Sequence, residues 1–393
     1  MPECAQSCWL AHPFASPSRS RLYSCARTFV ADAGVYVPTL TQEILDNAPE
    51  INIKGIGVGD PCTDNKAQQD SMDMLWYGHK NGFLQDDEFD FLWHNCSARI
   101  TSPIARGAWG AADTSADLTG RFSASYDNSS KSCTLAMRHF TGSSSRGFSQ
   151  GWPLAWINDL TLFGPAAVVG FGAKSSLNAM TAAYMMRDDV KAALHVDKSP
   201  SKVWPGPQPG WGYKGDYNAC NDAAAKDADS MIDFYRRISP RLAHGATVYN
   251  GDTDPCVSYE GTRIAIERVG FPERTGGHMR PWFFDASATT DELLHEKPVL
   301  FGPSLALFSA GPQFGGHTTN YANGLSFVTI HGSGHMVPQF RPRAAKRMLK
   351  AVLNNVLLSP LYESDANVSA MQDNEFDSYL DVWTKKAKAE AVP

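Results

Sequence analysis

The sequence has no long apolar run, no strong excess of charge and none of the common metal or nucleotide signatures. No stretch reaches the roughly 18 consecutive apolar residues that a membrane-spanning helix needs. The net charge of −6 over 393 residues argues against a nucleic-acid surface. No HExxH motif, CxxC pair or glycine-rich phosphate loop occurs, so we expect no metal and no cofactor. The sequence therefore predicts neither a membrane nor a nucleic-acid partner, and it leaves the oligomeric state open.

What is present is the composition of an enzyme-sized chain with a large core, since 43% of the residues are hydrophobic. The 8 cysteines lie at spacings that do not suit metal ligands and point weakly to an oxidising compartment. Three segments match the glycosylation acceptor sequence, namely Asn95–Ser97, Asn128–Ser130 and Asn367–Ser369. They add slight support for a secretory origin and for a glycoprotein.

The most informative segment is Gly332–Pro342 (GSGHMVPQFRP), which follows the apolar run Leu325–Ile330. The pattern predicts a buried strand, a sharp turn that exposes His335, and a helix with Pro342 in its first turn. Apolar residues then recur at helical spacing, at Ala344, Ala345, Met348, Leu349, Val352, Leu353 and Val356. A lone histidine is usually a core or surface residue. A histidine between a strand and a helix, however, is where an α/β-hydrolase keeps its general base.

A second segment, Ala246–Asp254 (ATVYNGDTD), places carboxylates upstream of this histidine. Residues 246–249 are apolar enough for a central strand, and the Asn-Gly-Asp-Thr-Asp sequence predicts a turn at its carboxyl end. Open α/β sheets react at those strand ends. The order Asp254 then His335 also fits the hydrolase order of nucleophile, acid and histidine. Aspartates that only cap the turn are the alternative.

Together the two segments resemble the serine carboxypeptidase family, and the resemblance covers most of residues 33–357. In that family the second aspartate of a GDTD-like turn orients the histidine, which points to Asp254 rather than Asp252. The resemblance implies an α/β fold: an α/β-hydrolase sheet, truncated at its N-terminal side, with an inserted helical and loop-rich cap. It also implies that Met336 lines the leaving-group side of the site, with core packing as the alternative.

The expected nucleophile is missing from the sequence. The family carries its serine in a GESYAG elbow followed by YVP and a helix, and Ala33–Pro38 (AGVYVP) resembles the downstream half. An ungapped alignment places Ala31 at the nucleophile position, and an alignment with a short deletion removes the Gly-Glu-Ser portion. Ser20 and Ser24 lack the glycine frame of an elbow. The NGGPG-type loop that supplies an oxyanion-hole amide does not occur in residues 1–30.

We expect four parts along the chain. Residues 1–32 form an atypical N-terminal segment, 33–67 the first part of the hydrolase core, 68–240 the cap, and 241–393 the second part of the core with the aspartate and the histidine. Met1–Arg27 shows no clear strand or helix period and lacks the apolar core of a signal peptide. A disordered leader, a transit peptide and a truncated or wrongly joined gene model are the three interpretations, and the last is favoured.

Several shorter segments resemble structural parts of the family. Tyr36–Asn47 is expected as the helix behind the elbow, Ile51–Gly59 as a strand, and Asp60–Asp64 as a GNxxTDP-like turn in which Asp60 replaces asparagine. The helix at Tyr184–His195 is structural in the family, so His195 is not expected to be catalytic. Residues 315–321 resemble the strand that pairs with the histidine strand, and the residues before them are expected as a surface insertion. A bridge between Cys96 and Cys133 is expected within the cap.

The resemblance implies a serine-type carboxypeptidase, a hydrolase that releases C-terminal amino acids from peptides through an acyl-enzyme. Peptide or protein C-termini are then the substrate, and the compartment is secreted or vacuolar and lysosomal. Two alternatives stay open, the first because the serine is absent and the second because the same triad also serves acyl transfer. One is a catalytically dead homologue that binds peptides or a partner through the cap. The other is an acyltransferase that passes acyl groups to small alcohols or amines.

Overall fold

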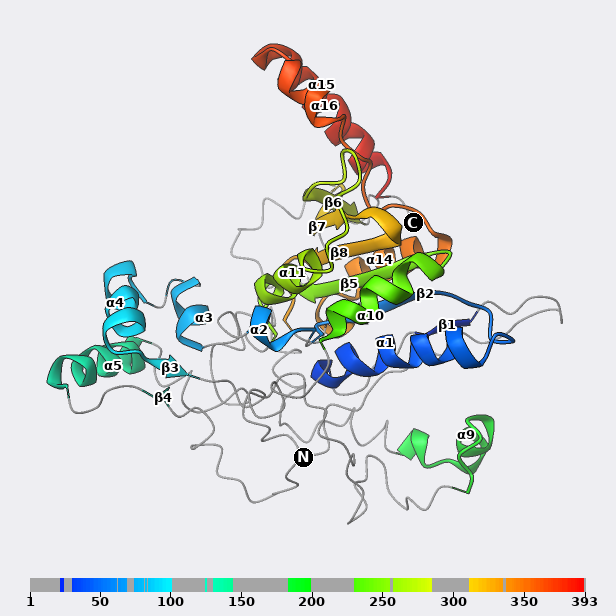
Figure 1. Cartoon of the computed structure of the whole chain (residues 1–393), viewed down its shortest axis with the longest axis horizontal. Coiled ribbons are helices and arrows are strands. Elements are labelled where there is room, and N and C mark those ends of the chain that lie inside the picture. The colour runs from blue at the N-terminus through cyan, green and yellow to red at the C-terminus, as the bar shows by residue number, and fades with distance from the viewer. Residues whose placement is uncertain are drawn as a thin grey trace.

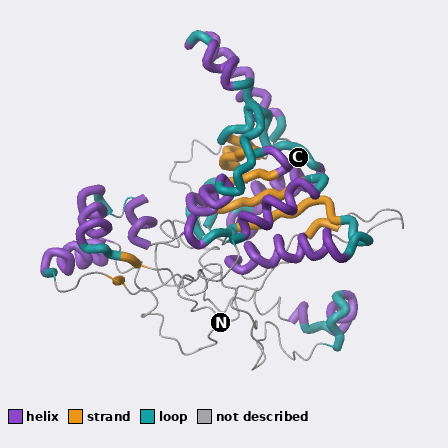
Figure 2. The backbone as a smooth tube through the Cα atoms, viewed as in Figure 1, coloured by secondary structure: helices purple, strands orange, loops and turns teal. Residues whose placement is uncertain are grey.

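The computed structural model describes residues 22–24, 30–61, 63–68, 74–80, 82, 84–100, 124–125, 130–143, 183–198, 230–254, 257–284, 311–334 and 337–391. At its centre is a mixed sheet with the strand order β1-β2-β5-β8-β7-β6. Its strands are β1 (Leu22–Ser24), β2 (Ile53–Gly59), β5 (Gly245–Gly251), β8 (Leu325–Ile330), β7 (Gln313–Asn320) and β6 (Arg280–Phe284). The first four run parallel, and β7 and β6 are antiparallel additions. The strands lie among helices (Figure 2), which confirms the predicted α/β class.

Helices of the described part lie on the sheet, in the predicted cap region and at the C-terminal end. Those of the sheet are α1 (Val30–Asn47), α2 (Asn65–Gln68), α10 (Met231–Ile238), α11 (Tyr259–Glu267), α13 (Val337–Phe340) and α14 (Pro342–Asn354). Those of the cap region are α3 (Met74–Lys80), α4 (Asp86–Asp90), the π-helical turn η1 (Phe91–Asn95), α5 (Lys131–Ser143) and α9 (Asp188–Ala193). The last two are α15 (Asp365–Ala370) and α16 (Asp373–Ala389), and short 3-10 turns occur at η4 (Ser239–Arg241) and η6 (Ala322–Gly324).

Different helices bury the two faces of the sheet, because side chains alternate along each strand. On β8, Leu325 and Phe327 pack into a core shared with α1, α10 and α11. Val328 and Ile330 pack into a second core shared with α14. In Figure 1, α1 and α10 lie in front of the sheet and α14 behind it. Because β1, β2, β5 and β8 run parallel, their carboxyl ends lie at one edge of the sheet, between these helices.

The central strand is longer than the sequence predicts. β5 is buried along its whole length and continues through Asn250 and Gly251, which pair with Thr329 and Ile330 of β8. The predicted turn therefore begins only at Asp252. Glycine suits position 251 because a Cβ there would lie 2.2 Å from the backbone oxygen of Ser333. The turn-forming residues Asn and Gly thus continue the ladder here instead of ending it.

The N-terminal region contains two elements that the pattern does not predict at these bounds. A strand occurs at Leu22–Ser24, where no strand is expected, and it pairs parallel with β2. The helix predicted over Tyr36–Asn47 begins earlier, at Val30. The strand predicted at Ile51–Gly59 is observed at Ile53–Gly59. A strand and a helix therefore precede β2 next to the parallel sheet.

The helix predicted after the histidine motif is confirmed as α14, with Pro342 in its first turn. Only part of the predicted apolar stripe is buried, however, because small residues make up much of the buried face, at Ala344, Ala345, Met348 and Ala351. Leu349 is 38% exposed and Val356 is 54% exposed. The helix ends at Asn355 in the left-handed conformation (φ 53°), so Val356 leaves the helical stripe.

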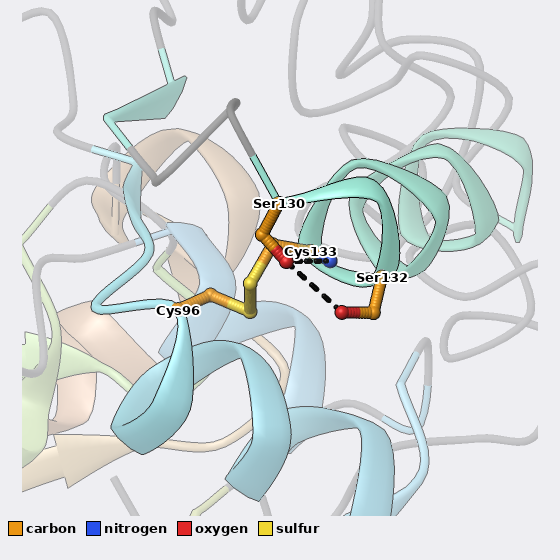
Figure 3. The surroundings of a disulfide bond; sticks show 4 residues. All are labelled: Cys96, Ser130, Ser132 and Cys133. Atoms are coloured by element: carbon orange, nitrogen blue, oxygen red, sulfur yellow. Dashed lines mark hydrogen bonds between the residues drawn. A yellow bond between two sulfur atoms is a disulfide. The ribbon is translucent and has the colours of Figure 1, made fainter.

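The expected bridge between Cys96 and Cys133 is present and is drawn in Figure 3. It joins the end of η1 to α5, where Ser130 and Ser132 lie beside it. Both cysteines belong to a core of the cap region that also contains Leu92 and Phe140 and is separate from the cores of the sheet. The predicted helix at residues 184–195 is observed as α9, with Asp188 and Asp189 in its first turn.

Residues 315–321 lie largely in β7, which pairs antiparallel with β8 as predicted. β6 was not predicted. Its first residue, Arg280, is fully buried and donates to Asn320 and to the backbone oxygens of Gly277, His278, Ser359 and Pro360. These bonds attach the antiparallel edge to the segment before α15. The rest of the expected insertion, 285–310, lies outside the described residues.

α15 and α16 follow the sheet domain and project away from it in Figure 1. α16 begins with a capping box between Gln372 and Glu375. Its later part is fastened by Trp383, whose Nε1 donates to the oxygen of Pro360 at 3.3 Å. Among the helices that the structure describes, none has the length and apolar character needed to cross a membrane.

Candidate functional site

The parallel strands β1, β2, β5 and β8 end at the same edge of the sheet, and polar residues follow three of them. Asp60 follows β2, Asp252 to Asp254 follow β5, and the turn at 331–334 follows β8. Asp254 is only 2% exposed. In enzymes with an α/β sheet, the catalytic acid typically lies at the carboxyl end of a central strand, the position that Asp254 occupies here.

Asp252 ties the turn after β5 to the turn after β8. Its Oδ2 lies 2.7 Å from Nδ1 of His331, and its Oδ1 accepts from the backbone N of Gly332 at 2.6 Å. The backbone N of Thr253 donates to the oxygen of Ser333 at 3.0 Å. Asp252 and its neighbour therefore fix the segment that leads directly to position 335.

Asp60 fixes the same edge from the other side. It adopts a positive φ of 44°, which aspartate tolerates better than most residues. Its Oδ1 accepts from the backbone N of Gly251 at 2.9 Å, and its own N donates to the oxygen of Tyr249 at 2.7 Å. The end of β5 is thus held by both neighbouring strands, and the carboxylate of Asp60 supplies an acceptor as the expected asparagine would.

Tyr77 of α3 contacts the segment Asp252–Asp254 after β5, although no sequence motif marks this tyrosine. Its hydroxyl donates to the oxygen of Thr253 at 3.2 Å, and the side chain is buried. Burial, followed by the charges of Asp254 and Asp252, raises the pKa of Tyr77 well above its ordinary value. Tyr77 therefore remains a neutral donor at any physiological pH.

The same helix is attached to α11 by Glu260. One oxygen of this carboxylate accepts from Nε1 of Trp76 at 2.9 Å, and the other pairs with Nζ of Lys80 at 2.8 Å. These contacts come from the region predicted as the cap. They position its first described helix over the end of β5.

Two histidines that no sequence motif marks lie near Asp252. His331 contacts the carboxylate of Asp252. His317 of β7 lies close enough to Asp252 and His331 for both to shift the pKa of His317. Partial burial lowers the pKa of His317, Asp252 opposes that shift, and His331 adds to it. The ring of Phe314 lies 5.2 Å from that of His317 and 5.0 Å from that of His331. The sequence Gly315-Gly316-His317 within a strand does not indicate that its histidine lies near an aspartate.

The other predicted site residues are His335, Met336 and Ala31. His335 and Met336 lie outside the described residues, and so does the side chain of Ala31. The backbone of Ala31 forms the second residue of α1, downstream of β1. The structure therefore brings together Asp254, Asp252 and the turn before His335. The pairing of Asp254 with His335 stays a prediction.

Within the described ranges, no group of three or more His, Cys, Asp or Glu side chains is arranged to hold a metal ion. The acidic groups at the sheet edge instead accept hydrogen bonds from backbone amides and a histidine. These groups suit the orientation of an imidazole, which is the part that an acid plays in nucleophilic catalysis.

A largely parallel sheet with helices packed on both faces and polar residues at its carboxyl edge fits the α/β-hydrolase class. The serine carboxypeptidase family model matches residues 31–355, and the chain belongs to that family. Serine carboxypeptidase-like 33 from Arabidopsis thaliana is 25% identical over 344 residues, which cover 82% of this chain and 59% of the relative. Serine carboxypeptidase 24 from the same plant is 25% identical over 332 residues, with the same two coverages.

The chain therefore spans less than two thirds of the length of these relatives. Among solved structures, the chain is similar to Kex1Δp, a prohormone-processing carboxypeptidase from Saccharomyces cerevisiae. The identity is 15% and the TM-score 0.46, over 83% of this chain and 61% of that one.

Proposed function

We propose that Asp254 and His335 are the acid and the base of a serine carboxypeptidase site that releases C-terminal amino acids from peptides. The observation that carries the proposal is the burial of Asp254 at the end of β5, beside a turn tied to the segment before His335. Membership of the serine carboxypeptidase family supports the reaction class.

In this mechanism a serine hydroxyl attacks the carbonyl of the last peptide bond and forms the acyl-enzyme. His335 accepts the serine proton and returns it to the leaving amine as the C–N bond breaks. Water then attacks the acyl group, with His335 again taking the proton, and the serine is released. Asp254 orients the imidazole and stabilises its charged form, and Met336 lines the leaving-group side.

The nucleophile must come from a form of the protein that carries the family elbow, because Ala31 occupies the aligned position here. Loss of the serine of a triad costs about 10^6-fold in rate. A chain without this serine would instead bind peptides or a partner through the region predicted as the cap, without acyl transfer. Ala31 is the observation that favours this second function.

An acyltransferase uses the same triad and differs in the acceptor of the acyl group. Release of an amino acid to water, compared with transfer to a small alcohol or amine, separates it from a peptidase. For the peptidase, the catalytically dead homologue and the acyltransferase alike, the proposed location is secreted or vacuolar and lysosomal. The Cys96–Cys133 bridge supports an oxidising environment.

The direct test is Asp254→Asn in a form of the protein that carries the family's serine elbow. We expect release of the C-terminal residue from an N-blocked dipeptide to fall by about 10^4-fold, as when the aspartate of a triad is neutralised. Asp233→Asn is the matched control, since this exposed aspartate pairs with Arg236 on α10 and lies outside the site. Undiminished turnover in Asp254→Asn, with the control also active, would show that the acid is misassigned.

A further inference from the structure

A cavity of about 800 Å³ lies away from the carboxyl edge of the sheet, and none of its lining residues belongs to the proposed catalytic site. Its walls come from α14, from the segment that follows α14, and from the last turn of α16 with the residue after it. Cavities of this size hold small organic ligands in many proteins.

Cationic side chains dominate the polar part of this cavity. Arg347 and Lys350 line it from α14, and Lys386 lines it from α16, whereas Glu390 is its single carboxylate. Residues three apart on a helix are neighbours, so the charges of Arg347 and Lys350 repel each other. Neither Lys350 nor Lys386 has an ion-pair partner among the described residues. A bound anion would relieve this repulsion.

Arg347 is held in place and still has an unused donor. Its Nη2 donates to the backbone oxygen of Glu390 at 2.9 Å, while its Nε is buried without a hydrogen-bond partner. A buried donor without a partner typically costs about 1–3 kcal/mol. Burial lowers the pKa of Arg347, and Glu390 acts in the opposite direction. The guanidinium is thus fixed before any ligand arrives.

The rest of the lining is apolar. Val356, Leu357, Pro360 and Leu361 form it, and the side chain of Val356 is 54% exposed. A fully hydrated anion gains nothing from such a wall, whereas a ligand with an apolar body removes it from water. We propose that this cavity binds a small amphipathic anion. Its carboxylate or phosphate head contacts Arg347, Lys350 and Lys386, and its apolar body covers Val356 and Leu361.

The test is calorimetric titration of the folded full chain with monomeric decanoate and, separately, decyl phosphate. Lys350→Ala/Lys386→Ala should weaken binding by about tenfold, as the loss of two partly exposed charge contacts does. The matched control is Lys346→Ala/Lys385→Ala, which removes the same charge from the same two helices at positions outside the cavity. We expect the control to bind as the unmodified chain does.

Decanol and inorganic phosphate separate the two halves of the ligand, and both should bind far more weakly than decanoate. The proposal is overturned if decanoate gives no saturable binding, if both double variants lose affinity equally, or if decanol binds as tightly as decanoate. Binding to phosphatidylserine vesicles without any binding of monomeric decanoate would also overturn it, because the site would then be a membrane surface.

Discussion

The three aspartates at the carboxyl edge of the sheet have different partners. Asp60 and Asp252 both accept from backbone amides, and Asp252 also contacts His331. Asp254 is the more deeply buried of the two in the turn, and its negative charge helps to raise the pKa of Tyr77. Asp60 and Asp252 therefore shape the edge through hydrogen bonds from backbone amides. Asp254 is the buried carboxylate of the turn and the one that we propose as the acid.

A different histidine gives a test of the structure that needs no activity. His278 lies between Glu273 and Asp365, with its Nε2 2.6 Å from Oδ1 of Asp365 on α15. The hydrogen bond to Asp365, followed by that to Glu273, raises the pKa of His278 above its ordinary 6.5. The stabilisation is therefore complete below about pH 6.5, the pKa of an unfolded histidine, and is lost as the pH rises through the higher folded value.

His278→Gln should lower the melting temperature most at about pH 5.5, and the difference should shrink as the pH rises beyond neutrality. The control is His94→Gln, because His94 of η1 is exposed and forms no ion pair with a carboxylate of the described residues. It should change the melting temperature little. A destabilisation by His278→Gln that grows with pH would contradict the ion pairs.

Single residues differ in how far the sequence reveals them. The turns after β5 and β8 were predictable because strand and turn chemistry mark them locally, whereas the choice of Asp254 as the acid rests on the family resemblance. Tyr77 and His317 were not, because their positions depend on packing between segments far apart in the chain, 176 residues in the case of Tyr77 and Thr253. No local pattern distinguishes a tyrosine that reaches a distant turn from one that fills a core.

At the scale of elements, strands with a clear apolar pattern were predictable and the short or irregular ones were not. β2 and β8 match the predicted bounds closely, whereas β5 extends beyond the predicted 246–249 at both ends. β6 begins with a buried arginine and a proline, both unusual in a strand, and it is tolerated at the sheet edge. β1 has only three residues, too few for any period to be recognised.

The cap region provides a prediction about an element. The Cys96–Cys133 bridge closes a loop of 37 residues around a small core of its own. Such a cross-link stabilises by about 3–4 kcal/mol relative to the open chain. In Cys96→Ser/Cys133→Ser, hydrogen exchange should accelerate in residues 84–96 and 131–143 while β5 and β8 stay protected. Ser132→Ala, beside the bridge, is the control and should exchange as the unmodified chain does.

Equal loss of protection in the cap region and in the sheet would contradict a separate cap core. So would unchanged exchange in α5, because the bridge would then contribute nothing to its stability. Either result would change how the cap region is seen to fold.

At the scale of the whole molecule, the sequence predicted the class of fold and the family, because two motifs at strand ends are specific in combination. It did not predict α15 and α16, whose attachment depends on Trp383 and Pro360 and on His278 and Asp365. The division into four parts at 32, 67 and 240 stays a prediction. α10 lies before the predicted boundary at 240, yet it packs into the same core as α1 and β5. This packing groups α10 with the sheet and not with the predicted cap.

We propose that this chain carries the Asp254 turn and the His335 turn of a serine carboxypeptidase site without its nucleophile. The most direct measurement is labelling of the folded chain with a fluorophosphonate probe, followed by mass mapping, with an active serine carboxypeptidase labelled in parallel. A cooperative melting transition shows beforehand that the chain is folded. Our expectation is no labelled serine in this chain and a labelled serine in the active enzyme. Stoichiometric label on any serine of this chain would contradict it.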